Sequence, residues 1–148
     1  MERNRVASLE QALNNFYTEY DYLPDPRAVK SKADAVFDTT DASGVELVKI
    51  LLGRETGEPK QNPKEMKFLD VQDAKSRKGG ITYDKDGNPT GVFDAWGHGY
   101  RILIDYDGNG DLIAPADSGA PGVLHGRHAA VYSLGKDGKG GKEAIRSW

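Results

Sequence analysis

Apolar residues near the start of the chain recur at separations of 3, 4, 3 and 4 positions, at Val6, Leu9, Leu13, Phe16 and Tyr20. This spacing puts them in one stripe along an amphipathic helix. Pro24 and Pro26 follow soon afterwards. Proline does not continue a helix, because it lacks the amide N–H and its ring clashes with the preceding turn. The pattern therefore predicts a helix over about residues 2–21.

The beginning of this helix admits two interpretations. Asn4 is of a residue type that caps helix N-termini. However, the apolar stripe is already in phase in the first turn, and Met1–Arg5 holds no clear capping pattern. We therefore prefer the expectation that the helix continues upstream of Met1.

A second, shorter helix is predicted over 44–52, within a loop-and-helix region that spans about 22–53. Ser43 and Glu46 have the spacing of a capping box, and Gly53 is placed to end the helix in a left-handed conformation. The residues expected to face inward are Val45, Val48, Leu51 and Leu52.

Residues 54–92 are polar and rich in glycine and proline, which predicts a long irregular loop. Two short strands are expected inside it, near Lys67–Val71 and Gly80–Tyr83. A connection of this length is usually functional or held in place by its neighbours.

Beyond this loop, apolar and polar residues alternate, as in strands. The alternation predicts strands at Tyr100–Ile104, Asp111–Ala114 and Ala129–Leu134, and Asn109-Gly110 suggests a hairpin between the first two. Ile145 and Trp148 are expected to close over the core. One helix followed by an antiparallel sheet in 93–148 predicts a single α+β domain over residues 1–148.

Composition narrows the possible functions. The chain of 148 residues has no cysteine, so disulfides, thiolate metal sites and cysteine nucleophiles are excluded. The net charge is −3 and no basic block is present, which argues against a nucleic-acid partner. No stretch approaches the roughly 20 apolar residues that span a bilayer, so the chain as given is expected to be soluble.

One acidic segment matches the first seven positions of a calcium loop, D-x-D-x-N-G-D, with its candidate ligands at Asp105, Asp107, Asn109 and Asp111. Alternating oxygen ligands and a sharp glycine bend suit this ion. The twelfth position, usually glutamate, is Ala116, and Asp117 comes one place late. A polar hairpin turn without metal is the alternative interpretation.

Other polar residues give weaker signals. No nucleophile or second acid lies at a catalytic spacing from Asp94 and His98, so no catalytic role is predicted for them. His125 and His128 lack further ligands for zinc. The glycine-rich tail contains three lysines, Lys136, Lys139 and Lys142. We expect them to be solvated or to pair with acidic patches on a neighbouring subunit.

Three segments resemble the major pseudopilin of type II secretion systems. Asp94-Ala-Trp96-Gly-His-Gly-Tyr100 is similar to that family's Asp-Pro-Trp-Gly-Asn-Pro-Tyr signature, although Ala95 and His98-Gly99 depart from it. Tyr132-Ser-Leu-Gly-Lys-Asp-Gly138 is similar to its Tyr-Ser-Leu-Gly-Ala-Asp-Gly loop, and Ile145-Arg-Ser-Trp148 to its Ile-x-Asn-Trp ending. The predicted first helix, with Tyr22-Leu-Pro24 after it, resembles the exposed half of the pilin spine helix.

The resemblance implies a pilin-like fold and a structural role without enzymatic activity. Trp96 is expected to fill the core at a corner, and Tyr100, Tyr132 and Trp148 to fix the fold. Calcium is implied in the tail loop, held by the carbonyl of Leu134 and by Asp137, with Glu143 beside the last expected ligand position.

The resemblance also implies assembly. We expect a leader cut by a methylating prepilin peptidase, an inner-membrane helix that this chain lacks, and a location at the periplasmic face of the inner membrane. The implied partners are copies of the chain, other pseudopilins and inner-membrane components of the secretion system. Two alternatives remain, an extracellular calcium-binding or adhesion module and a type IV pilin subunit of another filament machine.

Overall fold

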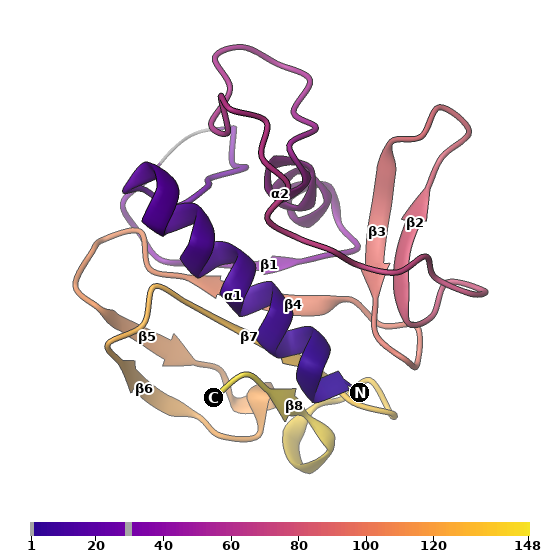
Figure 1. The fold of residues 1–148 in the computed structure, drawn as a ribbon. Helices are drawn as coiled ribbons and strands as arrows, with labels where there is room; N and C mark the ends of the chain where they lie inside the picture. Colours follow the sequence, from indigo (N-terminus) through magenta and orange to yellow (C-terminus); the bar gives the residue numbers. More distant parts are fainter. Residues whose placement is uncertain (1, 29–30) are drawn as a thin grey trace.

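The computed structural model describes residues 2–28 and 31–148, and it confirms the α+β class. Two helices and eight strands are joined by long loops, with short 3-10 turns at Ala116–Ser118 and Gly141–Glu143 (Figure 1). The elements are α1 (Glu2–Tyr20), β1 (Ala35–Asp38), α2 (Ala42–Leu52), β2 (Gly80–Tyr83), β3 (Pro89–Phe93), β4 (Tyr100–Ile104), β5 (Asp111–Ala114), β6 (Gly122–His125), β7 (Ala129–Ser133) and β8 (Ile145–Arg146).

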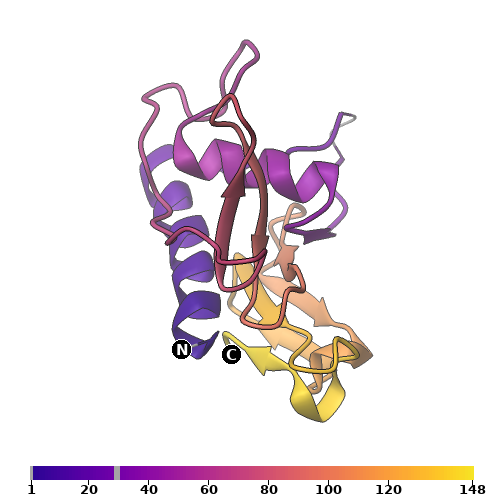
Figure 2. The same cartoon turned by 90° about the vertical axis from the view of Figure 1, so that its right-hand side faces the viewer.

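The central sheet is antiparallel and has the strand order β1-β4-β7-β8. α1 crosses one face of this sheet diagonally and packs against β7 and β8, while α2 lies nearer β1 and β3 (Figures 1 and 2). Two further sheets have two strands each, β2 with β3 and β5 with β6.

Alternation along β4 divides the apolar interior into two clusters, because successive side chains point to opposite faces of a sheet. Ile102 and Ile104 enter the main cluster under α1 and α2. Leu103 enters a second cluster on the other face, where the β5–β6 ribbon covers the sheet. Ile145 packs on the first cluster and Trp148 on the second, which confirms that the C-terminus closes over the core.

α1 agrees with the predicted helix in position and in its buried face. Four members of its apolar stripe are fully buried, and Tyr20 is partly buried against the same cluster. Asn4 lies inside the helix, so it is not the N-cap. The helix ends at Tyr20, and Asp21 after it has a left-handed φ of 62° and donates its N–H to the Tyr17 carbonyl.

α2 begins earlier than expected, and its cap is a different residue. The side chain of Asp41 accepts a hydrogen bond from Gly44 N, so the capping box predicted at Ser43 is wrong. Gly53 ends the helix with a φ of 73°, as predicted. The buried face also differs, because Leu47 and Ile50 are fully buried whereas two of the predicted residues are only partly buried. Those two are Val45 and Leu52.

The region 54–92 contains one of its two predicted strands, Gly80–Tyr83. No strand forms at Lys67–Val71. Instead, Pro89–Phe93 is a strand and pairs with β2 across the Asp84–Asn88 turn. The sequence did not indicate this hairpin, because its second strand begins with a proline and contains a glycine. Both residue types are uncommon within strands.

The predicted β4–β5 hairpin is also wrong, although both strands exist as expected. β4 pairs with β1 and β7, while β5 pairs with β6. The turn at Asn109-Gly110 therefore separates strands of different sheets. β1, β6 and β8 are strands that the sequence analysis did not predict, and β8 has only two residues.

The capping assignment in α2 can be tested by substitution. Asp41→Ala removes the side-chain acceptor for the Gly44 N–H, so the free energy of unfolding should fall by about 1 kcal/mol. Ser43→Ala is the matched control and should leave this free energy nearly unchanged. Urea unfolding followed by circular dichroism measures both, and equal losses in the two variants would contradict the assignment.

Candidate functional site: the Asp94 corner and two acidic loops

The corner between β3 and β4 is organised by a fully buried carboxylate. Asp94 has an exposed fraction of 0%. One of its oxygens accepts the backbone N–H groups of Trp96 (3.0 Å) and His98 (2.9 Å), and the other accepts the Ser133 hydroxyl at 2.7 Å. A buried carboxylate is costly unless such donors surround it. The corner is thereby joined to the end of β7.

A second buried carboxylate joins the same corner to α1. Glu2, 5% exposed, accepts the N–H of Ala95 at 3.1 Å and the hydroxyl of Tyr100 at 2.6 Å, and it pairs with Arg5. Burial and the neighbouring Glu2 carboxylate raise the pKa of the Tyr100 hydroxyl well above its usual range. The phenol therefore stays protonated and donates.

The expected role of Trp96 is not what the structure shows. Its ring is only partly buried and belongs to neither apolar cluster, so the expectation that it fills the core is wrong. Tyr100 and Tyr132 are buried as expected, and Trp148 meets Tyr132 edge-on at 6.0 Å between ring centroids. The corner is shaped by hydrogen bonds to Asp94, which a sequence pattern does not reveal.

The turn after β4 is built around Asp105, which is 4% exposed. Its carboxylate accepts the N–H groups of Gly108 (3.1 Å) and Gly110 (2.8 Å). Asp107 accepts the Asn109 N–H, and the Asn109 side chain accepts the Asp111 N–H. The backbone is thus held by its own polar side chains, as in the alternative of a polar turn without metal.

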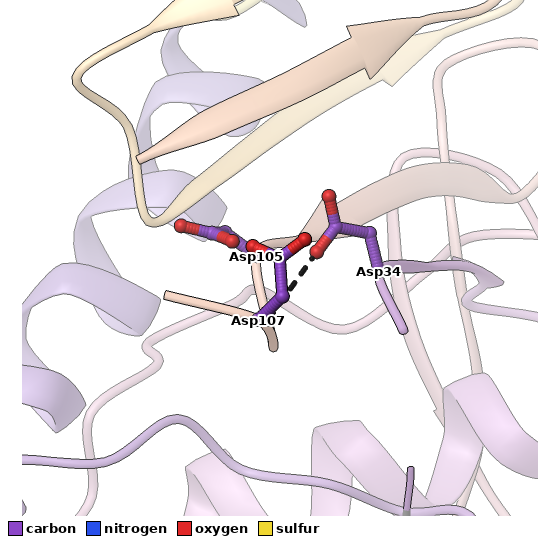
Figure 3. A group of neighbouring side chains, drawn as sticks. All are labelled: Asp34, Asp105 and Asp107. Atoms are coloured by element: carbon purple, nitrogen blue, oxygen red, sulfur yellow. Dashed lines mark hydrogen bonds between the residues drawn. The ribbon is translucent and has the colours of Figure 1, made fainter. Parts of the chain in front are cut away.

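A third acid, distant in sequence, joins this turn. Asp34, Asp105 and Asp107 each offer a carboxylate oxygen within 4.8 Å of the others. Figure 3 shows the Asp34 side chain directed at the turn, where its oxygen accepts the N–H of Tyr106 at 3.1 Å and lies 3.5 Å from that of Asp107. Pairing of Ala35 with Ile104 sets Asp34 beside Asp105. No local motif could have identified Asp34.

The electrostatics of these three carboxylates are unfavourable without a cation. Burial, together with the carboxylates of Asp107 and Asp34, raises the pKa of Asp105, and the hydrogen bond from Gly110 opposes this in part. Clustered carboxylates repel one another, and a divalent cation would relieve that repulsion. The cluster is therefore the candidate cation site of the described residues.

The other predicted ligand of this loop points elsewhere. An Asp111 oxygen lies 2.8 Å from the His125 ring across the β5–β6 ribbon. Asp111 is not part of the carboxylate group that Asp34 joins. His128 stacks on Tyr17 with ring centroids 4.0 Å apart. The calcium interpretation therefore remains a prediction, with Asp34 as an added candidate ligand.

In the tail loop, two of the three predicted calcium ligands accept hydrogen bonds from the loop's own backbone. The Leu134 carbonyl accepts the N–H of Gly140, and Asp137 is exposed and accepts the N–H of Lys139. The Glu143 side chain is exposed, while its backbone passes so close to Gly135 that a Cβ there would lie 2.1 Å from the Glu143 carbonyl oxygen. Within the described chain, Asp137 and Glu143 belong to no group of three acidic or histidine side chains.

Neither helix of the described chain is both long and apolar enough to cross a lipid bilayer. A scan against protein families, a search of curated proteins and a search of solved structures each found no match to this chain.

Repulsion within the acidic cluster predicts a pH-dependent effect of Asp34→Asn, which removes one charge and keeps an oxygen for the Tyr106 N–H. A raised folded-state pKa means that Asp105 favours folding when protonated, and that stability is lost as pH rises through this pKa. In chelator, the variant should be more stable than the native chain by about 0.5 kcal/mol near pH 7. The difference should vanish near about pH 3, because Asp105, whose pKa is raised, is then protonated and no longer repels its neighbour.

Urea unfolding at both pH values measures this effect, with Asp86→Asn in the exposed β2–β3 turn as a matched control. A variant that is less stable than the native chain at neutral pH would contradict the proposed repulsion.

Proposed function

We propose that this chain is the head of a pseudopilin, a structural subunit that assembles into a short periplasmic filament of a type II secretion system. Its role is assembly and not catalysis. In this proposal α1 continues as a membrane helix upstream of Met1. Copies pack through that helix, and inner-membrane components of the secretion system are the other partners.

The observation that supports this proposal is the direct joining of the three segments that carry the resemblance. Asp94 of the first segment accepts the Ser133 hydroxyl of the second. Ser147 of the third accepts the N–H of Val131 and donates to Glu10 of α1. Motifs that lie far apart in the chain thus form one hydrogen-bonded layer with the helix that would act as the spine.

The arrangement of α1 also suits a spine helix. Its apolar stripe is buried on the sheet, and its first turn is tied to the β3–β4 corner through Glu2. A helix held at both its first turn and its middle can transmit force from an upstream membrane segment to the head without rotating on the sheet.

The test of this proposal begins with the gene. The reading frame upstream of Met1 should encode a short charged leader and then an apolar stretch of about 20 residues. When the full-length protein is expressed together with a prepilin peptidase and the secretion machinery, the leader should be removed and filaments containing this subunit should form. A frame without the apolar stretch would overturn the proposal.

A calcium-binding module is the second candidate, favoured by the group of Asp34, Asp105 and Asp107. In either function, calcium would neutralise part of the repulsion at Asp105. An ion that binds only the native state stabilises it by mass action. The response to calcium therefore decides whether the site exists, and the reading frame decides which function uses it.

Calcium at about 100 times its dissociation constant should raise the melting temperature of chelator-treated protein by roughly 5–10 °C. Asp107→Asn should abolish this increase if the acidic cluster binds the ion, whereas Asp137→Asn should leave it intact. The opposite result would assign calcium to the tail loop. Differential scanning calorimetry measures the increase, and an unchanged melt of the native chain would remove both sites.

A further inference from the structure

Trp96 is a large aromatic residue that the packing of the head leaves partly exposed. Its ring belongs to neither apolar cluster, although its backbone N–H is held by the Asp94 carboxylate at 3.0 Å. Gly97, with a φ of 90°, makes the tight turn that follows, and Ala95 before it is exposed. The β3–β4 corner therefore presents an indole ring on a rigid support instead of burying it.

A two-residue turn of cationic sequence packs beside this corner. Lys75 and Lys78 exchange backbone hydrogen bonds of 3.0 and 3.1 Å, and Ser76 and Arg77 between them have left-handed φ values of 54° and 60°. A turn of this type usually carries asparagine and glycine, because left-handed values are costly for other residues, and such strain is concentrated at functional sites. A Cβ on Gly97 would lie 3.5 Å from the Arg77 carbonyl oxygen and 3.6 Å from the Lys78 side chain, so the turn contacts the corner.

The tail loop and the start of α1 belong to the same surface. A Cβ on Gly138 would lie 2.8 Å from the His98 ring, so the tail loop also contacts the corner. Glu2 of α1 accepts the Ala95 N–H at 3.1 Å. The lower halves of Figures 1 and 2 show the N-terminus of α1, the corner and the tail loop. We call this surface, made of Arg3 and residues 75–78, 95–98 and 136–142, the corner surface.

Exposed cations outnumber exposed acids on the corner surface. The cations are Arg3, Lys75, Arg77, Lys78, Lys136, Lys139 and Lys142, and the exposed acids within or next to its segments are Asp73, Asp137 and Glu143. In the part of the chain that the structure describes, none of these cations takes part in an ion pair. Arg77 overlies the Phe93 ring at 5.3 Å, and the nearby Asp38 is already paired with Arg101.

We infer that the corner surface rests on a membrane that contains anionic phospholipid. Its lysine and arginine side chains contact headgroup phosphates, and the Trp96 ring enters the interface between the headgroups and the acyl chains. An indole combines an apolar ring with a polar N–H, and tryptophan is accordingly enriched at that interface. Each cation close to an anionic membrane strengthens binding about fivefold.

The distribution of charge and the exposed ring favour a membrane over a small anion. A free phosphate needs donors that converge on one point, whereas these cations are spread over several segments with an aromatic side chain among them. The inference deepens the proposed function, on which its orientation rests, because an α1 that continues into the inner membrane would hold this end of the head at the bilayer. Binding of the head by itself does not require that helix.

Cosedimentation of the 148-residue chain with vesicles tests the inference. At low salt, vesicles of phosphatidylcholine with about one third phosphatidylglycerol should bind the chain, whereas pure phosphatidylcholine should not. Arg77→Asn combined with Lys78→Gln should weaken binding roughly 20- to 30-fold, because two cations are removed. Asparagine tolerates the left-handed conformation at position 77. The matched control is Lys32→Gln with Lys85→Gln, which removes two exposed cations outside the corner surface and should bind like the native chain.

Fluorescence distinguishes insertion of Trp96 from electrostatic attraction alone. On binding, the emission maximum of the native chain should shift to shorter wavelength, and phospholipids with brominated acyl chains should quench the emission. Trp96→Phe should lose both signals, because the remaining Trp148 packs against Tyr132 within the head. Melting curves verify that every variant is folded.

Three results would overturn the inference. The first is equal binding to neutral and anionic vesicles, or binding to neither. The second is binding without a change in Trp96 emission, because the ring then stays outside the interface. The third is loss of binding in inorganic phosphate but not in sodium chloride of the same ionic strength, which would indicate a site for a free anion.

Failure of this inference and failure of the proposed function remain distinguishable. A head that binds anionic vesicles, from a gene without an upstream apolar stretch, would retain the membrane contact and remove the pseudopilin assignment. An upstream apolar stretch with a head that binds no vesicles would retain the assignment and remove the membrane contact.

Discussion

The buried carboxylate of Asp94 is the interaction on which the arrangement of this molecule depends. It lies where β3 ends and the chain turns into β4, and it is satisfied by two backbone N–H groups of its own corner and by a hydroxyl from β7. A carboxylate in the interior without these donors would cost several kcal/mol. The corner must therefore close on β7 for the sheet to form as it does. Glu2 adds α1 to the same corner, so the helix, the central sheet and the C-terminal segment are positioned together.

This constraint also determines which surfaces lie at each end of the molecule. Because α1 and β4 are both held at the corner, the far end of each element reaches the opposite side of the head. There the β1–β4 register brings Asp34 beside the turn that follows β4. The far turn carries the three close carboxylates, and Arg27 lies over the Tyr106 ring of the same turn.

Several residues of the segments that resemble pseudopilins take part in the packing of the head. Asp94, Tyr100, Tyr132 and Trp148 all occupy structural positions, and the three segments that contain them contact one another. Trp96, the most conspicuous residue of the first motif, contributes less to the core than its size suggested. The predicted calcium ligands are divided, since Asp105 and Asp107 come together with Asp34 while Asp111 turns to His125. The proposed function therefore depends more on the hydrogen-bonded layer than on any single motif.

The sequence by itself determined the elements whose signal is local. The stripe of α1, the stop of α2 at Gly53 and the strands β4, β5 and β7 follow from periodicity and turn chemistry over a few residues. Only the tertiary structure decided the partners of those strands, the buried role of Asp94 and the presence of Asp34 in the acidic cluster. Each of these depends on contacts between residues remote in the chain, and a local pattern of polar and apolar residues carries no record of strand order or register.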